Sequence, residues 1–329
     1  MKIVANQVGI DVSKDQLVVA IDEQKARSFA NTARGIQELR AALPLHSQIH
    51  MEATGGFERL CRRALAPEFQ VFVHNPRRAR KLSEGVGVQA KTDPIDAQFL
   101  AQYGSLLRPH KLKSEEREDL ADLCRQIEKF KSDRANYLKE VKSKTKDGET
   151  MQFLRQAIEQ LGDLIAKMET RLAERLKESS LKDDYKLVQS IHCIGKVTAA
   201  VVLCELPEDF RERSAGQICS YAGLAPMDRS SGQYEGRRRV RRGNSRLKKA
   251  MYMPAITARV HEPWAKDLYE RLIAKGRTHQ QAIVALMRKL LARIVALPRR
   301  DQILVCGKPD RYGFGTWFQS PPALGITYL

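Results

Sequence analysis

The chain has 329 residues, of which 43% are hydrophobic and 29% are charged, and its formal net charge is +18. This composition excludes an intrinsically disordered chain, and the length is enough for about two domains with buried cores. No eighteen-residue apolar run and no signal-peptide pattern occur, so we expect a soluble, cytoplasmic protein without a membrane span. The positive charge indicates a polyanionic partner. Nucleic acid is preferred over a membrane, because no basic helix has a bulky aromatic apolar face.

The six cysteines are scattered and form neither a Cys-x-x-Cys pair nor a zinc-ligand spacing with histidine. They are Cys61, Cys124, Cys193, Cys204, Cys219 and Cys306. This pattern argues against a structural zinc site and against a disulfide framework, so we expect reduced thiols in the core.

The first hundred residues alternate between short apolar runs and helical segments. The sequence predicts strands at 8–11, 16–21, 27–30, 48–51 and 70–74, and helices at 31–43, at 57–65 and from residue 77 onward. The last of these helices begins with four cations, which are Arg77, Arg78, Arg80 and Lys81. Three strands followed by alternating helices and strands predict an α/β fold, with helices on the faces of a mixed sheet.

Two carboxylates open the next helical segment, residues 91–97. Asp93 and Asp96 are three residues apart, so both lie on one helical face. Asp11 and Glu52 each end an apolar run further upstream. Four acids from separate elements could converge on divalent metal, and in so basic a chain the chemistry would act on phosphate. A second interpretation, the commoner one for such a segment alone, makes Asp93 an N-cap before proline and Asp96 a capping-box acid.

Residues 115–178 have a different pattern, in which apolar residues recur in a 3-4 heptad rhythm on both sides of a polar break at 143–149. This rhythm predicts two long helices joined by a turn, or a coiled coil. The pattern leaves open whether the segment is an internal helical hairpin or an oligomerisation arm.

The following region, residues 186–206, is apolar, and it predicts two helical segments joined at His192-Cys193-Ile194-Gly195. Such a turn can offer backbone N–H groups to a phosphate, but an ordinary corner between helices is slightly favoured. A short helix is predicted at 214–221.

The most polar part of the chain follows. Residues 230–236 predict a flexible loop. The next thirteen residues carry eight cations, a density that favours binding to a phosphate backbone over a merely solvated basic face. These cations are Arg237, Arg238, Arg239, Arg241, Arg242, Arg246, Lys248 and Lys249.

Two further helices are predicted, at 245–260 with Pro254 inside it and at 278–297. The tail, residues 300–329, has no periodicity and receives no role.

Taken together, these motifs resemble the DEDD transposases of the IS-one-ten group of insertion sequences, which are relatives of the pilin-gene invertases. The acidic motifs that carry the resemblance are Gly9-Ile-Asp11-Val-Ser-Lys14, Glu52-Ala-Thr-Gly55 and Lys91-Thr-Asp93-Pro-Ile-Asp96-Ala97. In the second half, Tyr221–Pro226, Ser231-Gly232 and Gly243–Pro254 are similar to the C-terminal transposase domain of that family. Order and spacing match over residues 7–297, which favours the metal-site interpretation. One departure is that the family's Pro-Gly-Ile-Gly turn reads His-Cys-Ile-Gly here.

The resemblance implies an RNase H-like (RuvC-like) domain in which Asp11, Glu52, Asp93 and Asp96 bind Mg²⁺, with Mn²⁺ as a possible substitute. It implies a serine nucleophile at Ser231, which forms a covalent phosphoserine–DNA intermediate. The expected organisation is a RuvC-like catalytic domain at 1–110, a coiled-coil helical hairpin at 111–182, a mainly helical C-terminal transposase domain at 183–299 and the tail.

The resemblance also implies partners. These are donor and target DNA, a structured guide (bridge) RNA from the non-coding end of the element, and further copies of the chain, as a dimer or a tetramer on DNA in the bacterial cytosol or nucleoid. Three alternatives stay open at this point. They are a DNA invertase of the pilin-invertase type, a metal-dependent nuclease or junction resolvase without a covalent intermediate, and a non-catalytic nucleic-acid-binding protein.

Overall fold

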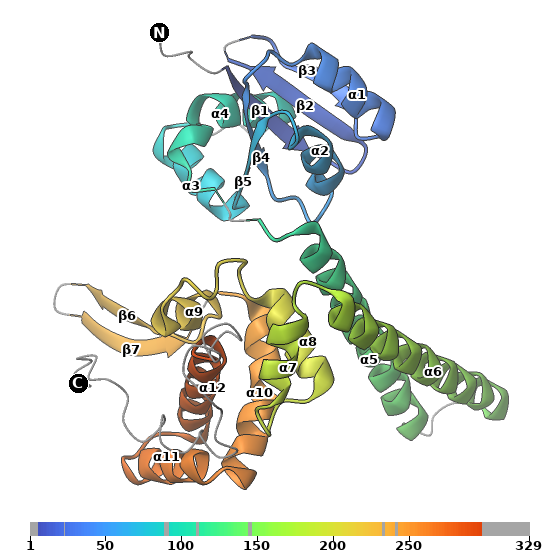
Figure 1. The fold of residues 1–329 in the computed structure, drawn as a ribbon, viewed down its shortest axis with the longest axis vertical. Coiled ribbons are helices and arrows are strands. Elements are labelled where there is room, and N and C mark those ends of the chain that lie inside the picture. The colour runs from blue at the N-terminus through green and yellow to red at the C-terminus, as the bar shows by residue number, and fades with distance from the viewer. Residues whose placement is uncertain are drawn as a thin grey trace, which may run out of the picture. The chain divides into compact units, whose positions relative to one another are not determined.

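The structure is a computed structural model that describes residues 6–22, 24–88, 92–109, 112–143, 147–231, 234–240 and 243–297, with the backbone alone between 227 and 239. The chain forms two compact units, Met1–Leu112 and Lys113–Leu329, drawn in Figure 1. In the described part of the chain, no helix is both long and apolar enough to cross a lipid bilayer. The finer division of the second unit at residues 182 and 183 stays a prediction, and the tail lies outside the described residues.

The N-terminal unit is built on a mixed five-stranded sheet, which confirms the predicted α/β arrangement. Its strand order is β3-β2-β1-β4-β5. β2 pairs antiparallel with β1 and β3, whereas β4 pairs parallel with β1 and β5. The strands are β1 (Gln7–Val12), β2 (Gln16–Ile21), β3 (Arg27–Ala30), β4 (Gln48–Glu52) and β5 (Gln70–His74).

Helices cover both faces of this sheet (Figure 1). Alternate residues of β1, namely Val8, Ile10 and Val12, are buried in a cluster with residues of α1 (Ala33–Ala42) and α2 (Glu58–Leu65). Because side chains alternate along a strand, Gly9 and Asp11 face the opposite side. That side is covered by α4 (Asp93–Tyr103), and α3 (Pro76–Gly85) packs against α4 in a separate apolar cluster. The one-turn helix η1 (Gly104–Leu106) follows α4.

The contact between α4 and the sheet depends on Gly9. A Cβ atom at this position would overlap the backbone carbonyl oxygen of Ala97 and the backbone nitrogen of Ala101. The helix backbone therefore lies directly on the strand, with Ala97 and Ala101 packed against Val18 and Ala20 of β2 in the same layer.

The C-terminal unit begins with two long helices, α5 (Glu115–Lys142) and α6 (Gly148–Glu178), which confirm the two helices predicted from the apolar rhythm. They lie along each other (Figure 1), and the Arg134 guanidinium donates a 3.1 Å hydrogen bond from Nε to the Ile158 carbonyl. A coiled coil formed with another chain stays a prediction.

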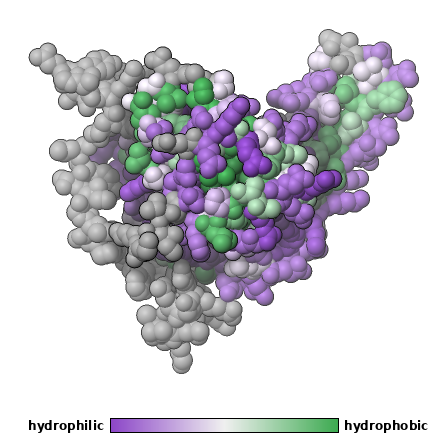
Figure 2. All heavy atoms as spheres, turned by 90° about the horizontal axis from the view of Figure 1, so that it is seen from above, coloured by the Kyte–Doolittle hydropathy of each residue, from purple (hydrophilic) through white to green (hydrophobic). Residues whose placement is uncertain are grey.

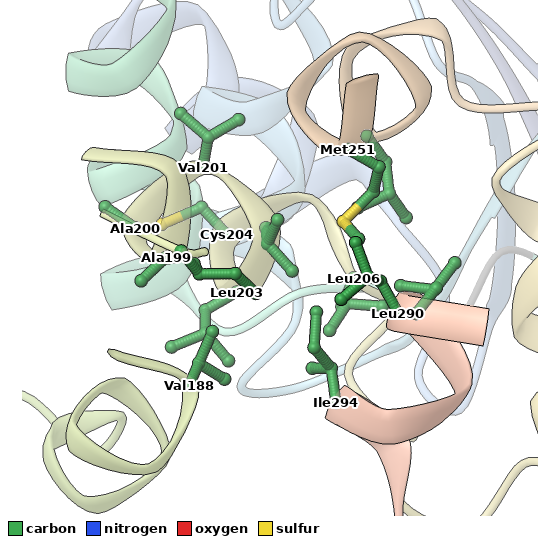
Figure 3. Packing of buried hydrophobic residues seen from close by; sticks show 14 of the residues in the cluster. Val188, Ala199, Ala200, Val201, Leu203, Cys204, Leu206, Met251, Leu290 and Ile294 are labelled. Atoms are coloured by element: carbon green, nitrogen blue, oxygen red, sulfur yellow. The ribbon is translucent and has the colours of Figure 1, made fainter. Parts of the chain in front are cut away.

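The core of this unit surrounds α8 (Lys196–Glu205), in which every residue from Ala199 to Glu205 is buried. A helix that is apolar on all sides is a core helix. Figure 3 shows side chains of α8 such as Val201 and Leu203 near Met251 of α10 and Ile294 of α12. The surrounding helices are α7 (Lys182–Gln189), α9 (Ala215–Tyr221), α10 (Ser245–His261), α11 (Pro263–Ala274) and α12 (His279–Val295).

The prediction of a flexible loop at 230–236 is wrong. Residues Pro226–Ser231 form β6 and Tyr234–Val240 form β7, an antiparallel pair with Ser231 opposite Tyr234. The prediction took a polar composition to mean that no strand could form, because most strands are stabilised by burial of apolar side chains. These two strands instead pair with each other through backbone hydrogen bonds. Helix α11 was also missing from the predicted elements.

The base of the β6–β7 pair is fixed to α8 by Asn244. Its backbone N–H donates to the Tyr221 carbonyl at 2.8 Å, and its side-chain Nδ2 donates to Glu205 Oε2 at 2.8 Å. The same side chain caps α10, since its Oδ1 accepts from the backbone N–H groups of Arg246 and Leu247. Just before it, Gly243 has φ +81° and touches the backbone of residues 222–223 so closely that a Cβ would overlap it.

Glu205 is the buried end of this anchor. Its side chain is only 4% exposed, and the Lys113 ammonium lies 3.7 Å from Oε2. Burial lowers the pKa of Lys113, which the Glu205 carboxylate partly opposes. The Tyr221 hydroxyl donates to the Glu205 backbone carbonyl at 3.2 Å. Tyr221, which precedes the strand pair, and Asn244, which follows it, are therefore both hydrogen-bonded to Glu205 at the end of α8.

We expect Gly9→Ala to destabilise the N-terminal unit by about 2 kcal/mol or more, because the new methyl group overlaps backbone atoms that cannot rotate away. Gly85→Ala is the matched control, since a Cβ there meets nothing within 4 Å. The measurement is the free energy of unfolding in urea. Equal stability of the two variants would contradict the close approach of α4 to β1.

Replacement of Asn244 by Ala removes a helix cap and leaves Glu205 Oε2 without its amide donor. We expect a loss of roughly 2–4 kcal/mol in the free energy of unfolding of the C-terminal unit. The exposed neighbour Ser245, substituted by Ala, should change stability by less than about 0.5 kcal/mol. An Asn244→Ala protein as stable as the wild type would show that the anchor contributes nothing.

Candidate active site

Two of the four predicted metal ligands are neighbours on adjacent parallel strands. In the pairing of β1 with β4, Ile10 lies beside Met51, and Asp11 and Glu52 are the next residues of the two strands. Ile10 and Met51 are buried in the cluster with α1 and α2, so the two carboxylates lie on the α4 side. Both side chains are half-buried. The sheet therefore places Asp11 and Glu52 together at the carboxyl ends of its parallel strands.

The other two predicted ligands open the helix that covers this face. Asp93 is the first residue of α4 and is exposed, and Asp96 is half-buried within the first turn. The N-cap is Thr92, not Asp93, because the Thr92 carbonyl already accepts from the N–H of Asp96 at 2.9 Å. Acidic side chains in a first turn are stabilised by the helix dipole. Asp96 directly precedes Ala97, whose carbonyl touches Gly9.

These positions fit a divalent metal in chemistry and in topology. Carboxylate oxygens are the protein ligands that Mg²⁺ prefers, often one or two per ion with water and phosphate completing the shell. In the described residues, however, no three Asp, Glu, His or Cys side chains lie close enough to form a metal-binding group. Asp11, Glu52 and Asp96 each interact with other groups of the chain. The structure thus places Asp11 and Glu52 on adjacent strands and Asp93 and Asp96 in the first turn of α4, and in the described residues it brings no three such side chains to ligand distance.

A buried histidine pair beside Glu52 was not predicted. His74 of β5 lies opposite Glu52 in the register, and its Nε2 is 3.0 Å from Nδ1 of His50. The other nitrogen of His50 is 2.9 Å from the side-chain oxygen of Gln7. Burial lowers the pKa of each histidine to about 4, and for His50 the proximity of His74 adds to the effect. Both rings are therefore neutral near pH 7 and add no positive charge next to Glu52.

The loop after Glu52 is held by a second residue that the sequence did not single out. The Glu58 carboxylate accepts from the backbone N–H groups of Thr54 at 3.0 Å and Gly56 at 2.9 Å. Glu58 is the first residue of α2 and is almost fully buried. A Glu two or three residues after a Gly-Gly pair is a usable signal for such a closure. Its effect is to fix the chain direction immediately after the candidate ligand Glu52.

The predicted nucleophile, Ser231, is the last residue of β6. Its side chain lies outside the described residues, as do those of Arg237, Arg238 and Arg239 on β7. The acids and Ser231 belong to different compact units.

The remaining predicted nucleic-acid-binding cations divide into three cases. Arg241 and Arg242 lie outside the described residues. Arg246 is exposed and Lys248 half-buried in the first turn of α10. Lys249 forms a 3.1 Å ion pair with Glu128 of α5, so part of its charge is already balanced within the protein.

Comparison with known families gives two matches in chain order. A model of the DEDD transposases of IS110, described as a transposase, matches residues 8–146. A second, described as the transposase IS116/IS110/IS902 family, matches residues 185–270. Together they cover more than half of the chain, including every predicted catalytic residue.

Individual relatives agree with these matches. The chain is 29% identical to the pilin gene-inverting protein of Moraxella bovis over 90% of its own length and 96% of the relative. It is 28% identical to an uncharacterised 43.6 kDa protein of insertion element IS110 from Streptomyces coelicolor, over 87% of this chain and 70% of that protein. It is 24% identical to the IS1111A transposase of Coxiella burnetii over 91% of both. The chain belongs to the IS110 family of transposases.

Proposed function

We propose that this protein is a DNA transposase or site-specific recombinase that cuts and rejoins DNA strands with a metal-dependent acidic site and Ser231 as nucleophile. Membership of the family makes it an enzyme that acts on DNA. The observation that supports the finer proposal best is the placement of Asp11 and Glu52 side by side under the helix that begins with Asp93 and Asp96.

The proposal includes an RNase H-like fold for the N-terminal unit. The sheet order β3-β2-β1-β4-β5, with an antiparallel start and parallel continuation, supports it. So does the position of the acids at the carboxyl ends of β1 and β4.

Asp11, Glu52, Asp93 and Asp96 would hold the divalent metal, Mg²⁺ or Mn²⁺. When bound, such an ion neutralises phosphate oxygens and stabilises the leaving oxygen. The chain's own part is to supply the carboxylates from the ends of packed strands and from the start of the helix that covers them.

Ser231 would carry out the covalent step. Its Oγ attacks the scissile phosphorus, an Oγ–P bond forms, and the P–O bond to the DNA leaving group breaks. The hydroxyl proton of Ser231 is transferred to the leaving oxygen, which becomes the free DNA hydroxyl. Because the phosphoserine keeps the phosphodiester energy, a second DNA hydroxyl can reverse the step on a new partner without ATP. The arginines that follow Ser231 in sequence would offset charge on the phosphate.

The proposal further includes a homo-oligomer. Large apolar side chains are exposed on the two long helices, at Leu138, Phe153 and Leu164. Figure 2 shows hydrophobic side chains near the end of the helical arm, as well as over other parts of this face, among hydrophilic ones. Exposed large apolar side chains on a long helical pair support pairing with another chain.

A structured guide RNA is the last element of the proposal. The net charge of +18 suits a protein that holds RNA as well as DNA. No described segment has a residue pattern that would read a particular DNA sequence, which suits target choice by base pairing.

A DNA invertase is the alternative that an observation favours. The pilin gene-inverting protein of Moraxella bovis is matched over 96% of its length. Inversion and transposition can use the same cleavage and rejoining chemistry, so the two differ in how the DNA sites are arranged.

The covalent step predicts a protein–DNA adduct that survives denaturation. With Mg²⁺, the RNA transcribed from its expressed element and duplex DNA from the flanks of its own gene, the wild type should form it, and Ser231→Ala should form none. Asp11→Asn should slow its formation by roughly a hundredfold or more, because a metal ligand is lost. The adjacent Ser230→Ala is the control and should retain it. Cleaved DNA without an adduct would establish the hydrolytic nuclease or resolvase instead.

The same variants test whether subunits share a site. When Ser231→Ala and Asp11→Ala chains are mixed, some activity should return if the acids and the serine act from different subunits. Absence of rescue, in samples shown to contain mixed oligomers, would place the complete site on one chain.

The RNA part predicts that purification of the protein together with its expressed element yields one discrete structured transcript from the flanking DNA. Sequencing of the bound RNA is the measurement. Recovery of bulk cellular RNA alone would argue against guidance.

A further inference from the structure

Helix α3 carries a concentrated positive charge that has no role in the proposed reaction. Its ten residues include four cations, Arg77, Arg78, Arg80 and Lys81, against one acid, Glu84. All five of these side chains are exposed. On the inner side, Ala79 is buried with Phe99 and Leu100 of α4, so apolar packing fixes the helix and directs its charged side chains to solvent.

Most of this charge is not balanced within the described part of the chain. Arg80 pairs with Glu84 at 3.1 Å. Arg77, Arg78 and Lys81 have no carboxylate partner among the described residues. Arg77 and Lys81 are four residues apart and Arg78 and Lys81 three, which brings like charges onto neighbouring positions and destabilises an isolated helix. Such a cluster is compatible with a polyanion that binds across it.

The fold puts this helix beside the acidic edge. His74, the last residue of β5, lies opposite Glu52 in the parallel pairing. Asn75 follows as the N-cap of α3 and accepts from the N–H of Arg77, and Pro76 begins the helix. Arg77 and Arg78 thus occupy the first turn, three and four residues beyond the strand position that neighbours a candidate metal ligand.

We propose that α3 is a second nucleic-acid-binding surface, which binds the phosphodiester backbone of the DNA strand that enters the acidic edge. The proposal rests on the proposed function in one respect, because it takes the acids to act on DNA. Arginine guanidinium groups bind phosphate oxygens in bidentate geometry, and two of them in one turn suit a backbone rather than a single anion. The contact fixes the strand without reading its sequence.

DNA is favoured over RNA as the occupant by position. The cations follow the strand next to Glu52, where the substrate of the acids must pass. They lie in a different compact unit from the cations that follow Ser231, so the two basic segments provide separate backbone contacts.

The test compares two charge-matched variants of the full-length protein. Arg77→Gln/Arg78→Gln removes two cations from α3. Arg34→Gln/Arg40→Gln removes two from α1, which covers the opposite face of the sheet and whose arginines pair with Glu38 and Glu68. Glutamine keeps helix propensity, and thermal unfolding checks that both variants are folded.

The probes are a labelled 40-base-pair DNA duplex and a labelled structured RNA hairpin, with Kd measured between 50 and 200 mM salt. For the α3 variant on DNA, we expect affinity at 100 mM salt to fall roughly tenfold or more. The slope of log K against log salt should become shallower by about 1 to 2, since two phosphate contacts are lost. The α1 variant should stay within about twofold of the wild type, with its slope unchanged.

Three results would overturn the proposal. They are an unchanged salt slope in the α3 variant, an equal loss in the α1 variant, and a loss confined to the RNA probe. Failure of the proposed function would be distinguishable from failure of this proposal. It would appear as the absence of a Ser231 adduct in the wild type, whereas the effect of the α3 variant on DNA affinity would remain.

Discussion

The close approach of α4 to β1 at Gly9 is the contact on which the acidic edge depends. With no side chain at this position, the helix backbone rests on the strand, and the alanines of α4 pack in the same layer. Asp11 lies two residues beyond Gly9 on the same face, roughly 6.6 Å along the strand. Asp96 immediately precedes the helix residue that touches Gly9. A single backbone contact therefore sets the spacing between the acids of the strand and those of the helix.

The serine is positioned by a different physical principle. A two-stranded ribbon is marginally stable alone, so the β6–β7 pair needs a fixed base. That base is polar and buried. Asn244, which follows β7, donates hydrogen bonds to the Glu205 side chain at the end of α8 and to the backbone carbonyl of Tyr221, which precedes β6. Asp11 and Glu52 thus stand on a packed sheet, whereas Ser231, the proposed nucleophile, stands on a two-stranded element whose base is held to the core by this hydrogen-bonded anchor.

The sequence was sufficient where a local pattern determines the structure. Apolar runs located all five strands of the mixed sheet, and Thr32 and Thr278 accept the capping hydrogen bonds that helix starts require. The pairing of β1 with β4 follows from no local signal, because it joins segments about forty residues apart. For this reason the sequence could predict that Asp11 and Glu52 end strands, but their adjacency needed the register.

The errors have equally specific causes. The sequence of the β6–β7 pair is polar, so the alternation of apolar and polar residues that reveals half-buried strands is missing. The dipeptide Gly232-Gln233 was nevertheless a usable signal, because glycine in the first position of a two-residue connection is typical of a β-hairpin. The His50–His74 pair was invisible because its partner atoms come from different strands. Helix α11 was missed although Pro263 begins it, a standard start signal.

Charge explains why an acidic site occurs in so basic a protein. Two like charges about 6 Å apart repel by roughly 3 kcal/mol at an effective dielectric constant of about 20, so carboxylates alone would repel a phosphodiester. In the proposed mechanism, a divalent ion held by the acids would offset part of this repulsion, and cations on neighbouring elements would offset the rest. The distribution of arginines fits that requirement. On α1, away from the acids, Arg34 and Arg40 are paired with Glu38 and Glu68. On α3, next to the acids, Arg77 and Arg78 have no such partner within the described chain. Because unpaired like charges reduce the stability of the free helix, their retention at this edge is explained most simply by the phosphate that they would contact.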